Sequence, residues 1–186
     1  MKTNGKTIVI SGPSGAGKNT LIHHLIDENN NLVHCISTTT RDPRKGERDG
    51  DDYHFIKKQE FQNSVDNDEF LEWAIVHEHY YGTSHKEINR IHDLGKDAIL
   101  DIDIQGALQI QNKASQAILI FIEPPSMEIL EERLRKRGTE AEEKIQKRMR
   151  EADEEMKHKG KYHHIVINDT IDNACKKLND IILTNV

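Results

Sequence analysis

Two glycines and a lysine near the start of the chain have the spacing of a phosphate-binding loop. Gly12, Gly17 and Lys18 fit the pattern Gly-x-x-x-x-Gly-Lys within the segment IVISGPSGAGKNT, residues 8–20. Glycines let successive backbone N–H groups face one anion, and the helix that follows adds its positive end. Lys18 adds a full charge for the outer phosphates of a nucleotide. The pattern predicts nucleotide binding by the whole loop: Gly12, Pro13, Ser14, Gly15, Ala16, Gly17, Lys18, Asn19 and Thr20.

Asn19 departs from this pattern, which has Ser or Thr after the lysine. The usual hydroxyl binds Mg²⁺, and here Thr20 carries a hydroxyl only one residue later. Three arrangements stay open: ligation by the Asn19 amide oxygen, a metal bound through water, or a metal held mainly by ATP. Mg²⁺ keeps several waters and binds few protein ligands, which favours the last two. The asparagine is therefore compatible with a working loop.

A charged segment, STTTRDPRKGE at residues 37–47, could provide a second anion site. Arg41 and Arg44 lie close together after a run of hydroxyl residues, and an arginine fork holds phosphate oxygens through paired hydrogen bonds. A solvated charged loop is the alternative for these arginines. The tyrosines of DYHF (52–55) and HYYGT (79–83) could add hydrogen bonds or simply pack.

Alternating apolar runs and helical patterns must position these residues. We expect strands at 7–10, 33–39, 98–103, 117–122 and 164–168, and shorter strands at 53–56, 70–76 and 80–81. We expect helices directly after the phosphate loop and at 58–65, 126–137, 140–157 and 171–183, with a charged loop at 41–52. Strands that alternate with helices predict an α/β protein with a mainly parallel sheet.

The bulk properties limit the class of protein. A chain of 186 residues is expected to form one domain, and a net charge of -6 argues against binding to nucleic acid polymers. No apolar run approaches the length of a membrane span or a signal peptide, so we expect a cytoplasmic protein that does not bind a membrane. Cys35 and Cys175 have no metal-ligand spacing and are expected to be reduced. The sequence does not decide between a monomer and a homo-oligomer.

A series of motifs resembles one enzyme family over nearly the whole chain. From about Lys6 to Leu183 the sequence contains, in order, GPSGAGK, STTTRDPRKGERDGDDYHF, EFLEW, YYGT, ILDIDIQG, RGTEAEEKIQKRM and VIND. In this order they resemble the guanylate kinases, which phosphorylate GMP with ATP and Mg²⁺. The resemblance implies an α/β three-layer P-loop kinase fold with a small β-rich GMP-binding insertion and a helical lid. It divides the single domain into a core (about 1–34, 95–125 and 160–186), a GMP-binding region (about 35–94) and a lid (about 126–159).

The resemblance also implies roles for residues on the acceptor side. The positions that match those binding the GMP phosphate are Ser37, Arg41, Arg44, Tyr53 and Tyr81. Glu72 and Thr83 match positions that face guanine, and Asp103 matches one that lines the GMP side. The chemistry supports Glu72, because a carboxylate can accept from the N1–H and 2-amino donors of guanine, a pair that adenine does not present. An exposed strand carboxylate is the alternative.

On the donor side the resemblance implies a metal site and a set of catalytic cations. Asp101 matches the acid that holds Mg²⁺, expected here to act through water, although capping at a strand end is the alternative for both aspartates. Asn168 matches a position near the adenine of ATP. The catalytic residues implied are Lys18, Arg41, Arg133, Arg137 and Arg148, the last three on the lid, where solvated helix faces are the alternative.

Two other functions fit parts of the same sequence. One is a kinase that acts on another phosphorylated small molecule, such as a sugar phosphate. The other is a non-catalytic guanylate kinase-like domain that binds protein ligands; such relatives characteristically lack a working phosphate loop. The loop glycines with Lys18, and the retention of Glu72 and Thr83, favour the transfer of phosphate from ATP to GMP.

Overall fold

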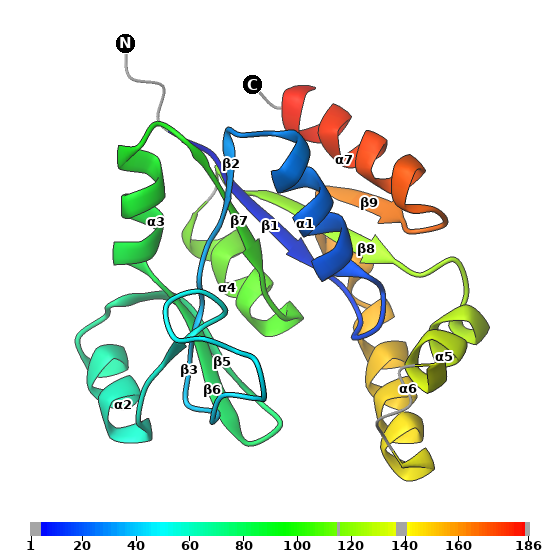
Figure 1. Ribbon diagram of the computed structural model, residues 1–186, viewed down its shortest axis with the longest axis horizontal. Coiled ribbons are helices and arrows are strands. Elements are labelled where there is room, and N and C mark those ends of the chain that lie inside the picture. Colours follow the sequence, from blue (N-terminus) through cyan, green and yellow to red (C-terminus); the bar gives the residue numbers. More distant parts are fainter. Residues whose placement is uncertain (1–4, 115, 137–140, 185–186) are drawn as a thin grey trace.

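A parallel sheet of five strands forms the centre of the molecule (Figure 1). The computed structural model describes residues 5–114, 116–136 and 141–184. All strand pairs of this sheet are parallel, as is usual for strands covered on both faces. The strand order across the sheet is β2 (Leu32–His34), β7 (Asp97–Asp101), β1 (Thr7–Ser11), β8 (Ile118–Glu123) and β9 (His164–Ile167).

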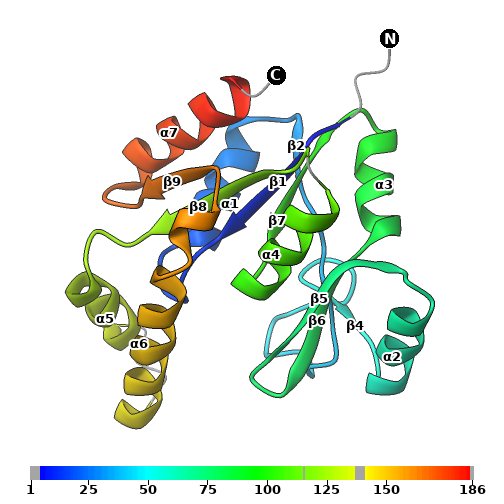
Figure 2. The same ribbon diagram turned by 180° about the vertical axis from the view of Figure 1, so that it is seen from behind.

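Helices cover both faces of this sheet, which gives three layers. On one face α1 (Lys18–Glu28) and α7 (Ile171–Thr184) pack their apolar side chains against those of the sheet, which include Ile10 of β1 and Ile120 of β8. On the other face α3 (His85–Asp93) and α4 (Ile104–Lys113) pack over a second apolar cluster that contains Val9 and Phe121. Figure 2 shows the sheet from the side of α3 and α4. Alternate side chains of one strand thus enter different cores, which explains why the strands are apolar throughout.

Two parts of the chain project from one end of the central sheet (Figures 1 and 2). One is a smaller sheet with helix α2 (Lys58–Asp66), and the other is the pair of helices α5 (Met127–Lys136) and α6 (Glu142–Met156). The smaller sheet has the order β4 (His54–Phe55), β3 (Thr38–Thr39), β6 (His79–Ser84) and β5 (Phe70–Val76). Beside it lies α2, where the Phe61 ring stacks on Phe70 at 4.4 Å between centroids. The lid helices α5 and α6 share a small core of their own, and the short helix η1 (Lys159–Lys161) follows them.

The predicted fold class is confirmed, and three details of the secondary structure differ. The expected strand 33–39 is two strands, β2 and β3, which belong to different sheets. The expected strand 98–103 ends at Asp101, because Asp103 caps the next helix. The helices α3 and α4 were not predicted. Cys35 and Cys175 are both buried and unpaired, as expected, and no described helix is both long and apolar enough to cross a membrane.

Candidate active site

The phosphate loop follows β1 and leads directly into α1. Gly12 has a φ of 139°, and a Cβ placed there would lie 2.3 Å from the carbonyl oxygen of Ile122. Gly17 precedes the first helical residue with a φ of 92°, and its Cβ would lie 2.4 Å from the Asn168 amide nitrogen. Side chains rarely adopt these backbone angles, and both places are already filled by neighbouring atoms. The loop shape therefore requires glycine at these two positions.

Lys18 curls back over the loop that precedes it. Its Nζ donates to the carbonyl oxygens of Gly12 at 2.7 Å and Pro13 at 3.4 Å. Asp101 lies at the carboxyl end of β7, opposite Ile10 of β1, and so beside the loop. Burial raises the pKa of the Asp101 carboxyl, and the nearby positive charge of Lys18 opposes that rise. A lysine and a buried carboxyl group thus lie near each other beside the phosphate loop.

The two aspartates have different structural roles. Asp101 ends the strand, whereas Asp103 is the cap of α4, and its Oδ1 accepts from the Gly106 N–H at 2.9 Å. Burial raises the pKa of Asp103 as well. Capping was the alternative role expected for both aspartates. Asp103 does act as a cap, at the start of α4. The oxygen donors near the loop, the Asp101 carboxyl and the exposed Asn19 amide, are of the kind that Mg²⁺ prefers.

A pocket of about 480 Å³ lies next to the loop on the side of α7. Asn168 is buried in its wall, where the side-chain amide donates to the Ala16 carbonyl oxygen at 2.7 Å. Arg133 donates to the carbonyl oxygens of Asn168 at 3.0 Å and of Ala16 at 3.4 Å. These bonds connect α5 and the end of β9 to the loop. The lining residues are Gly15, Gly17, Thr20, Arg133, Lys136, Asn168, Asp169, Thr170 and Ile171.

Glu72 and Thr83 lie opposite each other on β5 and β6. The Thr83 hydroxyl donates to Glu72 Oε1 at 2.7 Å, and Glu72 is only 3% exposed. Burial raises the pKa of Glu72 to about 7; the Thr83 bond lowers it in part and the neighbouring Asp103 raises it further. A Cβ on Gly106 would lie 2.2 Å from Glu72 Oε2. The alternative of an exposed carboxylate at Glu72 is therefore wrong.

Arg41 is held in a fixed orientation beside two tyrosines. Its two terminal nitrogens donate to the two oxygens of Glu47, each at 2.9 Å, and its Nε donates to the Tyr81 hydroxyl at 3.3 Å. Its guanidinium lies 5.5 Å from the Tyr53 ring centre, and hydrogen bonding to Glu47 raises the Arg41 pKa. The Arg41 side chain is thus paired and largely shielded from water rather than solvated.

The other two residues expected at the acceptor phosphate are placed less specifically. Arg44 is exposed, and its backbone N–H donates to Glu47 Oε2 at 2.7 Å. Ser37 is half-buried, and its carbonyl oxygen accepts from the His54 N–H at 2.9 Å. Among the residues expected at this subsite, the structure brings Arg41, Tyr53 and Tyr81 into mutual contact.

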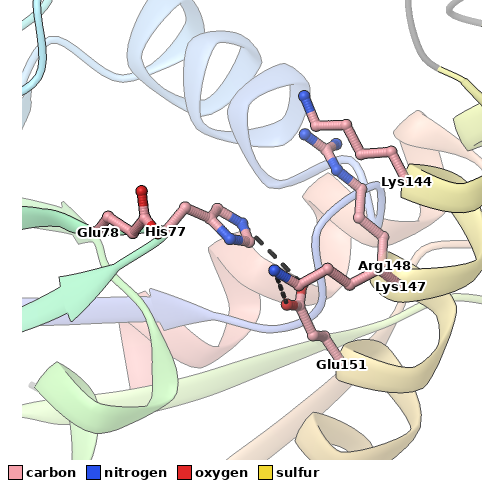
Figure 3. A pocket seen from close by; sticks show the side chains of 6 residues that line it. All are labelled: His77, Glu78, Lys144, Lys147, Arg148 and Glu151. Atoms are coloured by element: carbon pink, nitrogen blue, oxygen red, sulfur yellow. Dashed lines mark ion pairs between the residues drawn. The ribbon is translucent and has the colours of Figure 1, made fainter.

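The lid helix α6 contacts both sides of the site. Arg148 donates to the Ser14 hydroxyl of the phosphate loop at 3.4 Å. One turn further along, Glu151 lies 4.0 Å from the ring of His77, at the tip of the β5–β6 hairpin, and 3.9 Å from Lys147 (Figure 3). These side chains line a pocket of about 280 Å³ between hairpin and lid. Arg137, the remaining lid arginine of the sequence analysis, lies outside the described residues.

The structure adds two acids that were not assigned from the sequence. Glu47 binds Arg41 through both oxygens, a contact within one loop that the sequence does not distinguish from solvated charge. Glu155 of α6 lies near Lys18, and the Ser14 backbone N–H donates to it. Burial raises the Glu155 pKa to about 7. The spacing of Arg148 and Glu155, seven residues apart on a helix, is the signal that could have placed both on the loop-facing side.

The chain is similar to known proteins over nearly its whole length. The chain is 49% identical over 183 residues to the guanylate kinase of Caldanaerobacter subterraneus subsp. tengcongensis, covering 98% of this chain and 89% of that protein. It is 46% identical over 179 residues to the guanylate kinase of Clostridium perfringens, covering 96% of this chain and 83% of that protein.

Solved structures show the same similarity in three dimensions. The crystal structure of guanylate kinase from Anaplasma phagocytophilum matches with a TM-score of 0.78 at 31% identity, over 97% of this chain and 85% of that one. A shikimate kinase from Bacteroides thetaiotaomicron, at 11% identity and a TM-score of 0.52, shares the fold alone, over 96% of this chain and 98% of that one. The sequence model of guanylate kinase matches residues 4–185. The resemblance drawn from the sequence motifs is thus confirmed, and the chain belongs to the guanylate kinase family.

Proposed function

We propose that this family member transfers the γ-phosphate of ATP to GMP, which gives ADP and GDP. One observation carries the proposal: a phosphate loop with its lysine and a buried carboxylate–hydroxyl pair lie at the same end of the central sheet. Lys18 and Glu72 are both close enough to Asp103 for their charges to interact with it. A nucleotide whose base binds Glu72 would therefore lie beside a donor that binds the loop.

The donor nucleotide is proposed to bind along the phosphate loop. Residues 12–20 would bind the phosphates through backbone N–H groups and Lys18, with the adenine near Asn168 in the adjoining pocket. In the structure the Asn168 side chain bonds Ala16 of the loop, so its contribution to ATP binding includes holding the loop in place. Mg²⁺ would be held by ATP oxygens with Asp101, through water, and would neutralise charge that develops during transfer.

The acceptor is proposed to bind with its base at Glu72 and its phosphate at Arg41. Glu72, with Thr83 and Asp103 beside it, would accept from guanine, while Arg41, Tyr53 and Tyr81 would bind the phosphate with Ser37 and Arg44. Both Arg41 terminal nitrogens are occupied by Glu47, so the phosphate would bind the open side of this pair or displace the carboxylate.

Transfer itself needs positioning and charge neutralisation rather than a side-chain nucleophile, because the GMP phosphate attacks directly. Lys18 would act on the transferred group from the loop, and Arg41 from the acceptor side. Arg133 and Arg148 already contact loop atoms at 3.4 Å, which supports their proposed role on the triphosphate, together with Arg137. The two free, buried cysteines are compatible with action in the cytoplasm, which is part of the proposal.

A coupled assay for ADP formation from Mg-ATP tests the proposal, with GMP, AMP, CMP and UMP compared as acceptors. We expect turnover with GMP and at least about a hundredfold lower kcat/KM with AMP, because a buried carboxylate left without its donors is costly. Turnover of a sugar phosphate instead would refute the choice of acceptor. ATP binding without turnover of any acceptor would refute catalysis.

Replacing Asn19 by Ser is expected to leave kcat within about tenfold of the wild type, a change of about 1.4 kcal/mol at most. The reason is that Asn19 is exposed at the start of α1, and Mg²⁺ needs few ligands from the protein. Steady-state assays over a range of Mg²⁺ concentrations measure the effect. Complete loss of activity in this variant would contradict the expectation and make the Asn19 amide a required ligand.

A further inference from the structure

Strand β5, which carries Glu72, is the outer strand of the smaller sheet. It pairs with β6 on one side, and the pairing register shifts between Phe70 and Glu72, as at a β-bulge. Bulges change the direction of neighbouring side chains and leave backbone groups without ladder partners. The other edge of β5 faces α4. The position of Glu72 therefore depends on how side chains of α4 hydrogen-bond to the backbone groups along this edge.

Two side chains of α4 bind this edge on both sides of Glu72. The Gln109 amide donates to the Trp73 carbonyl oxygen at 2.6 Å and accepts from the Trp73 N–H at 3.3 Å, in the manner of a neighbouring strand. Lys113 donates to the Leu71 carbonyl oxygen at 3.0 Å. The residues before and after Glu72 are thus each tied to the helix by a side chain.

The same face of α4 also contacts the Glu72 carboxylate. Gly106, Gln109 and Lys113 are spaced three and four residues apart, so they lie along one side of the helix. A Cβ on Gly106 would lie 2.2 Å from Glu72 Oε2, so this glycine allows the carboxylate to approach the helix backbone. Asp103, which caps the helix three residues earlier, accepts from the Gly106 N–H. The helix fixes the strand, the carboxylate and its own capped end as one unit.

We propose that Gln109 and Lys113 are positioning residues for base selection: they hold the β5 backbone on both sides of Glu72 so that both carboxylate oxygens meet the acceptor base. The inference rests on the proposed function, in which that base is guanine. Neither side chain touches the nucleotide in this proposal. Their effect is on the orientation of Glu72, and it therefore appears in the choice of base rather than in the transfer step.

The acceptors GMP and IMP distinguish this role from a purely structural one. Hypoxanthine keeps the N1–H of guanine but lacks its 2-amino group, so a misplaced Glu72 costs GMP a second hydrogen bond that IMP never makes. In Gln109→Ala we expect KM for GMP to rise about tenfold and the GMP-to-IMP ratio of kcat/KM to fall at least about threefold. KM for ATP should stay within about twofold.

A matched control lies two residues away on the same helix. Gln111 also donates its amide to a backbone carbonyl, but to that of Lys161 at 2.7 Å rather than to one of β5. Gln111→Ala should therefore leave the GMP-to-IMP ratio unchanged. Lys113→Met should lower the ratio and Lys113→Arg, which keeps a donor, should restore most of it. Equal losses for GMP and IMP in Gln109→Ala, or the same losses in Gln111→Ala, would overturn the proposal.

A second measurement does not depend on activity. Hydrogen exchange of the Trp73 amide in the nucleotide-free protein should be faster in Gln109→Ala than in the wild type and Gln111→Ala. If Gln109→Ala does not fold, Gln109→Met serves instead, because it keeps most of the side-chain length but is only a weak acceptor for the Trp73 N–H and cannot donate to the Trp73 carbonyl. Unchanged exchange of the Trp73 amide would overturn this inference but would leave the proposed function standing. A wild type that shows protected exchange but no GMP turnover would overturn the proposed function, and the base-selection role with it.

Discussion

Replacement of Lys18 by Met is expected to lower kcat about a thousandfold. Removing one charged or donating group from the transferring phosphoryl group has effects of this size in related sites, because charge develops there during transfer. Methionine retains most of the side-chain length but cannot donate to the Gly12 and Pro13 carbonyls that Lys18 now binds. The loop glycines are unchanged, so ATP should still bind, with lower affinity. Single-turnover rates with saturating ATP and GMP measure the loss.

A lysine remote from the loop provides the control for this variant. Lys86 is exposed on α3, and Lys86→Met should leave kcat within about twofold. Thermal unfolding of both variants shows whether either change acts through stability. A Lys18→Met protein that folds normally and keeps more than about a tenth of the wild-type kcat would contradict the role assigned to this lysine.

Replacement of Glu72 by Gln is expected to remove most of the preference for GMP. The amide offers one acceptor oxygen and places an NH₂ group against a guanine donor, so kcat/KM for GMP should fall about a thousandfold, or about 4 kcal/mol. Activity with AMP should change much less. Glu69→Gln, an exposed residue just before β5, is the matched control. An unchanged ratio of GMP to AMP activity would remove Glu72 from base recognition.

The raised pKa of Glu72 adds a pH dependence to the same experiment. Burial raises this pKa to about 7, and only the ionised carboxylate accepts from both guanine donors. Below pH 7 the group becomes protonated, so kcat/KM for GMP should fall about tenfold per pH unit, whereas Glu72→Gln should lose the part of this dependence that Glu72 contributes. The folded protein also binds this proton more tightly than the unfolded chain. Stability contributed by the protonated group is therefore lost as pH rises from about 4.5 towards 7.

The sequence predicts the central strands and the loop well because their signals are local. Ile8, Val9 and Ile10 form a fully buried run that glycines end, and such a run has few alternatives to a covered parallel strand. The helices α3 and α4 escaped prediction for different reasons. In α3 only Ile88 and Ile91 are buried apolar residues among charged ones, and α4 begins within the run ILDIDI, which continues the pattern of a strand.

The site could be predicted only as far as its residue types. Motifs located Glu72 and Thr83, but their hydrogen bond depends on the strand register, and the pKa of Glu72 depends on burial by α4. The pairing of Arg41 with Glu47 and the bonds of Gln109 to Trp73 are likewise set by tertiary packing. A glutamine on a helix carries no sequence signal that distinguishes such a contact from solvation.

The bridge between the hairpin and the lid has a consequence for the speed of each catalytic cycle. The His77 ring and the Glu151 carboxylate lie 4.0 Å apart. Both side chains are in contact with water: that of His77 is 54% exposed and that of Glu151 is 39% exposed. A pair so exposed contributes less than about 1 kcal/mol. The His77–Glu151 pair therefore adds little to the free energy that opposes separation of the hairpin from α6, so this pair by itself is not expected to limit opening of the site after transfer.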